Sequence, residues 1–398
     1  MTLLLFRKLT LLSIFLVFLF RPGYLLGAQK VIGTSIAVRE MYDDNIYLWA
    51  GVKRDDFVTT IRPSATLDIK METTDIKGEM SLNILRYADE TELNTVEQTY
   101  TVGAHFLTSE RLSIGLDGRY TRDTTLETEL TETGVGLIRS IRQNYSFSPS
   151  IMYALSEKDS LSLSPFYMCS NYESSSYSDY WVSGINLNYE RLLKGKRLSL
   201  IGQAGYNHIK FKSTRYLIGG RYNNYQLYGG INYLFSETLK MSLLLGIRYT
   251  DSKMKSRGYV GPYSFIILYK EKTTGWVADV NLSKTYQRGI LMLGARRQIL
   301  PSGLGDQLET NRLYIHFINN FTERLRGEVD ASYYQGKGEV TIGTYHTWHI
   351  IPTLRYYLTK DINLELNYSH ISYKYGNFHS DRNTILLGME WNWKYLWH

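Results

Sequence analysis

Apolar and polar residues alternate along most of the chain with a period of two. The clearest segments are residues 112–120, 240–250, 362–369 and 385–397. In the second of these, Leu243, Leu245 and Ile247 share one face. Ser242 and Arg248 lie on the other. Strict alternation predicts β-strands with one apolar and one polar face, and helical spacing is not sustained anywhere beyond residue 28. We therefore predict an all-β protein.

The first 28 residues have the composition of a secretory signal. Arg7 and Lys8 precede an apolar run over residues 9–20, and the small residues Gly27 and Ala28 follow. The run of about 12 residues is shorter than the roughly 20 that a membrane-spanning helix needs. We expect cleavage after Ala28, so that residues 1–28 are a signal peptide and residues 29–398 form one exported domain.

Two observations favour lipid as the partner of the apolar faces. One is the secretory signal. The other is the placement of tyrosine, which makes up 34 of the 398 residues, and of tryptophan toward the predicted strand ends. Amphipathic rings suit a membrane interface at that position. Because lipid offers no hydrogen bonds, a sheet inside it must close on itself. We predict a single transmembrane antiparallel up-and-down β-barrel in the outer membrane of a Gram-negative-type envelope.

The turns give an independent strand count. Short turns of the type Ser or Thr followed by a charged residue recur near residues 109, 156, 236, 322 and 359, and looser turns fall near residues 72, 195 and 287. Eight tight turns divide the chain into nine pairs of strands. This predicts 18 strands, with 16 as the alternative, and places both termini on the periplasmic side with the short turns.

Longer connections alternate with the short turns and are predicted to be extracellular. They fall at residues 42–56, 88–94, 123–143, 171–177, 213–219, 251–273, 301–306, 335–343 and 376–381. Residues 134–140 and 263–269 could form further strands or hairpins, and we treat both as loop structure. We expect the loops at 123–143 and 251–273 to act as a lid or constriction over a lumen wide enough for water.

Charged residues of both signs occupy positions predicted to face the lumen. The candidates for contact with a passing molecule are Asp117, Arg119, Arg248, Asp279, Arg326, Arg355, Glu365 and Glu390. A strongly ion-selective pore would carry a ring of one sign. The mixture, together with inward asparagine, serine and tyrosine, favours a neutral, hydroxyl-rich passenger. The alternative is that these charges only pair with one another across strands.

Other chemistry is sparse in the sequence. Four carboxylates, Asp43, Asp44, Asp55 and Asp56, could bind Ca²⁺, although solvated loop carboxylates are more common. Cys169 is the single cysteine, and we find no nucleophile elbow, Walker loop or dinucleotide fingerprint. The net charge of +7 falls to +4 without the signal. We therefore expect no cofactor, no metal site, no nucleic-acid partner and no enzymatic activity.

The last predicted strand carries a candidate assembly signal. Gly388, Trp391, Trp393 and Trp397 follow the spacing that the barrel-assembly machinery reads at the end of outer-membrane proteins. A terminal aromatic residue would normally close this signal, whereas here His398 follows Trp397. The same residues also fit an ordinary lipid-facing strand.

Two segments resemble the β-barrel porin 2 family. The first is Tyr42-Asp43-Asp44-Asn45-Ile46, followed by the strand from Asp56 to Pro63 with the sequence DFVTTIRP. The second is residues 145–157, which are similar to a later hairpin of that family. Ser64 stands where the family often has glycine.

The resemblance implies an outer-membrane barrel, often encoded beside exopolysaccharide or exosortase genes. It implies a conduit for exopolysaccharide that works with a periplasmic polysaccharide export protein and an inner-membrane co-polymerase. Two alternatives stay open: a general diffusion porin for small solutes, and a plugged structural or adhesive surface barrel.

Overall fold

The computed structural model describes residues 29–135, 139–193, 197–214, 217–260, 263–339 and 343–397. The predicted signal peptide and its cleavage site lie outside the described residues. Within the described ranges, no helix is both long enough and apolar enough to cross a membrane.

Eighteen strands make up nearly all of the described chain. They are β1 (Gln29–Asp43), β2 (Asp56–Lys70), β3 (Thr74–Tyr87), β4 (Thr95–Leu107), β5 (Leu112–Thr124), β6 (Ile141–Ala154), β7 (Asp159–Tyr172), β8 (Tyr180–Leu192), β9 (Leu198–Phe211), β10 (Leu217–Ser236), β11 (Leu239–Val260), β12 (Tyr263–Thr285), β13 (Gly289–Ser302), β14 (Asp306–Asn320), β15 (Leu325–Gly338), β16 (Tyr345–Tyr357), β17 (Ile362–Tyr375) and β18 (Phe378–Trp397). Two short helices, η2 (Thr91–Leu93) and α2 (Glu129–Thr133), lie in the connections.

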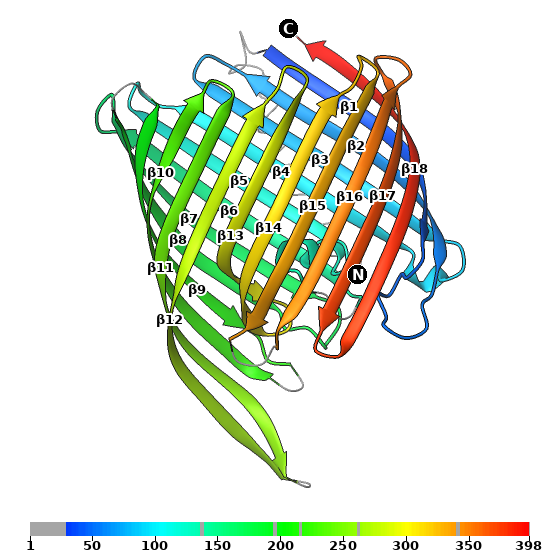
Figure 1. Ribbon diagram of the computed structural model, residues 1–398, viewed down its shortest axis with the longest axis vertical. Coiled ribbons are helices and arrows are strands. Elements are labelled where there is room, and N and C mark those ends of the chain that lie inside the picture. Colours follow the sequence, from blue (N-terminus) through cyan, green and yellow to red (C-terminus); the bar gives the residue numbers. More distant parts are fainter. Residues whose placement is uncertain are drawn as a thin grey trace.

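Each strand pairs antiparallel with the next one along the chain, and the last pairs with the first. Ile36 on β1 lies opposite Trp391 on β18, and the same residue lies opposite Pro63 on β2. The sheet is therefore a closed barrel, and the predicted count of 18 strands is confirmed (Figure 1). Closure removes the sheet edges that a membrane would not tolerate.

The predicted alternation of short and long connections is confirmed in part, because the connections predicted to be long at 301–306 and 376–381 are only residues 303–305 and 376–377. Seven of the short turns join their strands directly, such as the turn between Ser236 and Leu239. The eighth, near residue 195, joins β8 to β9 through residues 194–196, which are outside the described residues. Serine or threonine supports these turns: Ser236 Oγ accepts a hydrogen bond from the backbone N–H of Leu239 at 3.1 Å. The start of β1 and the end of β18 lie at the short-turn end (Figure 1).

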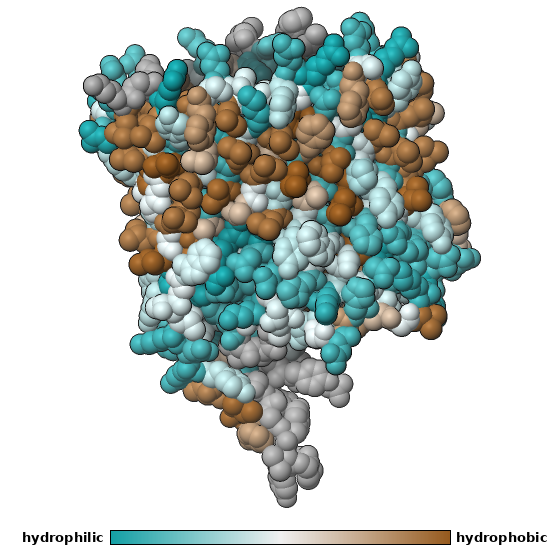
Figure 2. Space-filling view, viewed as in Figure 1, coloured by the Kyte–Doolittle hydropathy of each residue, from teal (hydrophilic) through white to brown (hydrophobic). Residues whose placement is uncertain are grey.

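On the face shown in Figure 2, a hydrophobic belt covers the half of the wall nearest the short turns, and most residues below it are polar. On β10, Tyr225 and Phe235 are 50% and 49% exposed and stand at the two edges of this belt. Ten residues at about 3.3 Å per residue, tilted by about 40°, span about 25 Å, the height of the apolar band of outer-membrane barrels. Residues of the opposite parity, such as Tyr222 and Asn224, face the lumen and are fully buried.

A third predicted long connection is also wrong. Residues 251–273 form no long loop, because β11 and β12 continue as a paired hairpin that projects beyond the barrel (Figure 1). Residues 263–269 accordingly belong to β12. The pairing of β12 with β13 stops at Ala278 and Arg297, so the hairpin leaves the wall there. Charged residues on the outward face of this hairpin, such as Lys253 and Lys270, break the apolar pattern and mimic a loop sequence.

Candidate functional site

The connection between β5 and β6 folds into the lumen. We call its described part, residues 125–135 and 139–140, the inner loop. It contains α2, which is visible inside the ring of strands (Figure 1). Gly134 ends the helix with φ = 79°, a left-handed conformation that glycine adopts readily. A Cβ at Gly134 would lie 2.6 Å from Cβ of Tyr334, so the loop packs closely on the wall there.

The inner loop is hydrogen-bonded to the wall opposite the strands that carry it. Tyr345 on β16 donates to the backbone oxygen of Thr133 at 2.7 Å, and Thr347 donates to that of Gly134 at 2.5 Å. Tyr334 on β15 donates to the backbone oxygen of Thr131. Half of the ring separates β5 and β6 from β15 and β16. The loop therefore crosses the lumen.

An apolar cluster forms where the inner loop meets this wall. Leu126, Leu130 and Val135 of the loop are buried there. Their partners come from the first connection and from β14 to β17, and they are Leu48, Leu308, Tyr334, Tyr345, Ile371 and Tyr373. Burying apolar side chains contributes roughly 1.5–3 kcal/mol each. The extracellular part of the barrel thus has a core of its own, unlike a water-filled pore.

Two buried arginines hold the inner loop at its base. Arg382 on β18, only 4% exposed, contacts Asp43 Oδ2 at 2.6 Å and Glu127 Oε1 at 3.0 Å. Arg142 on β6 contacts Glu132 Oε2 at 2.8 Å and Asp123 Oδ1 at 3.4 Å. Removing one partner of a buried ion pair is strongly destabilising, because the other charge is left without compensation.

Two carboxyl groups of the inner loop have shifted pKa values in opposite directions. Enclosure in the lumen opposes ionisation of Glu127, but Arg382 and Arg139 prevail, so the pKa of Glu127 is lowered. Burial raises the pKa of Glu129, and Arg142 only partly offsets this effect. Glu129 Oε1 accepts hydrogen bonds from Gly303 N at 2.8 Å and Ser302 Oγ at 3.2 Å, which fixes the loop to the end of β13.

The four predicted calcium ligands each bind a different partner in the protein. Asp43 binds Arg382, and Asp44 accepts hydrogen bonds from Asn383 N at 2.6 Å and Nδ2 at 2.8 Å. Asp55 accepts one from Tyr42 at 3.1 Å. Asp56 accepts backbone hydrogen bonds from residues 88–90. This arrangement orders the first connection and gives no support to the calcium hypothesis.

Most predicted lumen charges are paired with one another or with neighbouring polar groups. Arg248 contacts Glu339 at 2.6 Å and Glu309 at 3.2 Å. The other contacts are Asp279 to Arg296 at 2.7 Å, Arg326 to Glu328 at 3.6 Å, Arg355 to Glu365 at 2.6 Å, and Glu390 to Ser35 and Asn363 at 3.2 Å each. The alternative in which these charges pair with one another is therefore the better description for five of the eight, and Glu390 is hydrogen-bonded to neutral side chains instead.

Asp117 and Arg119 on β5 differ from the other six. Within the described part of the chain neither makes an ion pair, and both are exposed. They lie toward the periplasmic end of the lumen, a few residues after the turn that precedes Leu112. They are the predicted residues best placed to meet a solute.

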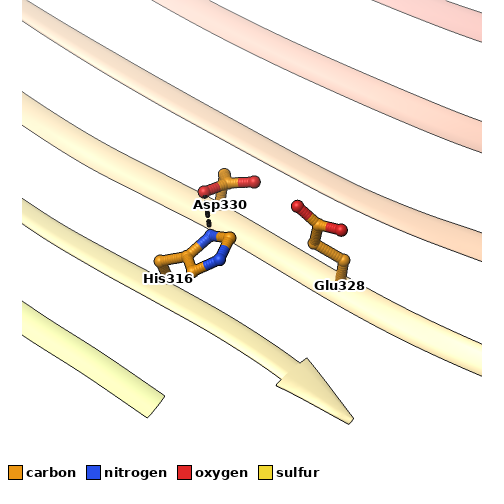
Figure 3. A group of neighbouring side chains, drawn as sticks. All are labelled: His316, Glu328 and Asp330. Atoms are coloured by element: carbon orange, nitrogen blue, oxygen red, sulfur yellow. Dashed lines mark hydrogen bonds and ion pairs between the residues drawn. The ribbon is translucent and has the colours of Figure 1, made fainter. Parts of the chain in front are cut away.

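A histidine and two carboxylates also meet in the periplasmic half of the lumen. His316 on β14 and Glu328 and Asp330 on β15 have ligand atoms within 4.8 Å of one another (Figure 3). His316 Nδ1 lies 2.6 Å from Asp330 Oδ1, whereas Glu328 stands apart and contacts Arg326 (Figure 3). All three side chains are partly exposed, so this group adds a polar surface to the lumen.

The predicted assembly signal lies on β18. Trp391 pairs with Ile36 and Ile362 in the closing seam of the barrel, and Gly388 pairs with Arg39 and Glu365. Trp393 is exposed on the outer wall. The position of Trp397 at the end of β18 fits a signal at the last strand, whose recognition stays a prediction.

Sequence reasoning missed the residues that fasten the inner loop. Arg382 is far in sequence from Glu127, Glu129 and Arg142, and single charged residues in loops carry no pattern. A signal was nevertheless present. Arg142 and Arg382 each lie near the extracellular end of a strand, close to an aspartate on the neighbouring strand.

The sequence and the structure were compared with known proteins. No protein family matches the sequence, and no curated protein matches it either. Among solved structures, OccAB4 of Acinetobacter baumannii is similar at a TM-score of 0.47 and 11% identity, with 92% of this chain and 98% of that chain covered. OpdK of Pseudomonas aeruginosa, solved with vanillate, is similar at a TM-score of 0.46 and 12% identity, with 94% of this chain and 100% of that chain covered. The siderophore receptor PirA of Pseudomonas aeruginosa is similar at a TM-score of 0.46 and 9% identity, with 91% of this chain and 80% of that chain covered.

Proposed function

We propose that this protein is a gated outer-membrane channel, that the inner loop is its gate, and that the solute is a secreted polysaccharide. The observation that carries the proposal is the inner loop itself, which crosses the lumen and is fastened by Arg382 and Arg142. A fastened loop favours a channel that opens on demand over one that is permanently open.

The lining of the lumen supports a neutral, hydroxyl-rich solute. Because the lumen charges are largely paired, the field along the path is weak. Amides and hydroxyls stand between them, such as Asn367 bonded to Thr353 at 2.7 Å and Tyr228 bonded to Gln226 at 3.2 Å. Hydrogen-bonding groups and aromatic rings are what carbohydrates contact. An export role would require a periplasmic polysaccharide export protein and an inner-membrane co-polymerase to deliver the polymer.

Gene deletion combined with conductance measurements tests the proposal. Deletion should abolish surface polysaccharide while intracellular synthesis continues, and the purified barrel should conduct only briefly or weakly in a planar bilayer. Steady large conductance with unchanged surface polymer would instead establish the general diffusion porin.

A plugged adhesive barrel is the second candidate, and the projecting β11–β12 hairpin favours it. Phe265, Ile266, Leu268 and Tyr269 are exposed on this hairpin outside the belt. Closed conductance in every condition, together with cell attachment that is lost when the hairpin is shortened, would favour this candidate over the channel.

A further inference from the structure

Four cationic side chains form a continuous row around the outer wall of β9 to β12. Arg221 on β10 lies directly opposite Lys210 on β9 and Lys253 on β11. Lys253 in turn lies opposite Lys270 on β12. We call these four residues the basic row. Trp181 on β8 continues it, opposite Lys210.

The basic row faces the membrane side of the wall. On β10, Arg221 has the parity of Tyr225 and Leu227, which are exposed, while Tyr222 faces the lumen and is buried. On β11, Lys253 has the parity of Ile247 and Tyr249, which are also exposed. The cations therefore have no part in lining the channel.

The row lies at a defined height above the hydrophobic belt. Tyr206, Tyr225 and Tyr249 form an aromatic row on β9, β10 and β11, with ring centroids 5.1 and 6.1 Å apart. On each of these three strands, the cation of the basic row lies four residues nearer the extracellular end than the tyrosine. Four residues rise about 13 Å along a strand, or about 10 Å along the membrane normal at a tilt of about 40°. Aromatic rings mark the interface, so the cations lie at the level of lipid headgroups.

Nothing within the described residues neutralises the basic row. None of its four cations forms an ion pair there, and Lys210 instead stands 4.9 Å from the ring centroid of Trp181. Two carboxylates on this face lie beside other lysines: Asp251 is opposite Lys272, and Asp179 pairs with Lys212 at 3.0 Å. Like charges directly opposite each other destabilise a sheet. A row of four such residues is therefore unfavourable unless an anion binds it.

Two adjoining grooves have the shape and polarity of a lipid site. The upper groove, of about 610 Å³, is lined by the basic row together with Trp181, Lys255 and Leu268. The lower groove, of about 490 Å³, lies on the belt below and is lined by apolar groups including Leu227, Ile247 and Trp276. A charged groove above an apolar one matches a phosphorylated headgroup above acyl chains.

We propose that the outer wall of β8 to β12 binds a phosphorylated glycolipid of the outer leaflet, with its phosphates on the basic row and an acyl chain in the lower groove. Bound phosphates would relieve the repulsion between the four cations and fix the base of the projecting hairpin. The site is independent of the solute that passes through the lumen.

The test compares binding of diphosphorylated lipid A to the full barrel in phosphatidylcholine nanodiscs. The test variant is R221Q/K253Q/K270Q, and the control is K158Q/R324Q/K360Q, which removes the same charge from exposed residues at the short turns. Each cation near an anionic lipid surface increases the binding affinity about fivefold. Because three cations are removed, we expect the test variant to bind the lipid about a hundredfold more weakly. The control variant should bind as the wild type does. A further variant, K253R/K270R, should retain binding.

Two other measurements separate the source of the phosphate and the folding of the variants. Dephosphorylated lipid A should bind no better to the wild type than to the test variant, and inorganic phosphate should not displace the lipid. Heat-modifiable gel mobility should be the same for all variants. Equal lipid binding by wild type and a folded test variant, or displacement by inorganic phosphate, would overturn the proposal.

Discussion

Arg382, on the last strand, contacts Asp43 at the end of the first strand, with 2.6 Å between Nη2 and Oδ2. The same guanidinium reaches Glu127 of the inner loop at 3.0 Å. One side chain therefore joins the closing seam of the barrel to the loop that crosses the lumen. Closure of the ring and the position of the inner loop are physically coupled at this residue.

Replacement of Arg382 should release the inner loop. R382Q leaves Asp43 buried without its cation, which costs about 3–5 kcal/mol and frees Glu127. We expect longer and larger openings in single-channel recordings. R326Q is the matched control, since Arg326 pairs with Glu328 on its own strand and does not touch the loop. Unchanged openings in a folded R382Q barrel would show that the ion pair does not hold the gate.

Acid should open the channel through Glu127. Its pKa is below the ordinary 4.5, so the ion pair with Arg382 is complete at neutral pH and is lost as the pH falls through that lower folded-state value. The raised pKa of Glu129 acts in the opposite sense, because its protonation favours the docked loop. We expect conductance to rise below pH 4.5. In E127Q this pH step should disappear, and a step of unchanged size would assign the titration to another group.

A single methyl group at Gly134 should dislodge the inner loop. G134A adds a Cβ 2.6 Å from Cβ of Tyr334 and strains a φ of 79°, which together cost about 2 kcal/mol or more. The measurement is cleavage of the protein within residues 125–140 when proteinase K is added to intact cells. G376A is the control: its φ is 57°, but nothing lies within 4 Å, so it carries only the backbone strain. Equal cleavage of both variants would remove the steric explanation.

Asp117 and Arg119 should set ion selectivity, because they are the predicted lumen charges with neither an ion pair nor a side-chain hydrogen bond among the described residues. D117N should shift the reversal potential in a KCl gradient toward anion preference, and R119Q should shift it toward cation preference. Variants of paired charges, such as D279N, should change it less, since Arg296 already compensates Asp279. Reversal potentials that respond to D279N but not to D117N would place the solute path elsewhere.

Arg248 should be essential for the wall near β12. It bridges to Glu309 and Glu339, and burial raises the pKa of Glu339 although Arg248 opposes this. R248Q leaves Glu339 without its cation, whereas Glu309 keeps Arg297, and we expect a loss of about 3 kcal/mol. The measurement is the temperature at which the heat-modifiable band converts to the unfolded form. A midpoint equal to that of R326Q would contradict this expectation.

The sequence determined the barrel more fully than the gate. Alternation such as Leu243, Leu245 and Ile247 reflects lipid on one side and water on the other, so it records strand parity and number directly. The projecting hairpin escaped this reasoning because both of its faces meet water beyond the belt. The docking of Glu127 and Glu129 escaped it because their partners lie on distant strands, and only the closed ring brings them together.

The ring is joined least securely between β12 and β13, where eight residue pairs hold it, compared with 14 between β1 and β18. The covalent ends of the chain and the weakest lateral junction are therefore at different places on the circumference. Under force or denaturant, the barrel should separate first between β12 and β13. It would then open into a sheet with β12 and β13 as its two edge strands. The first and last strands of the chain, β1 and β18, would then be neighbouring strands in the interior of that sheet.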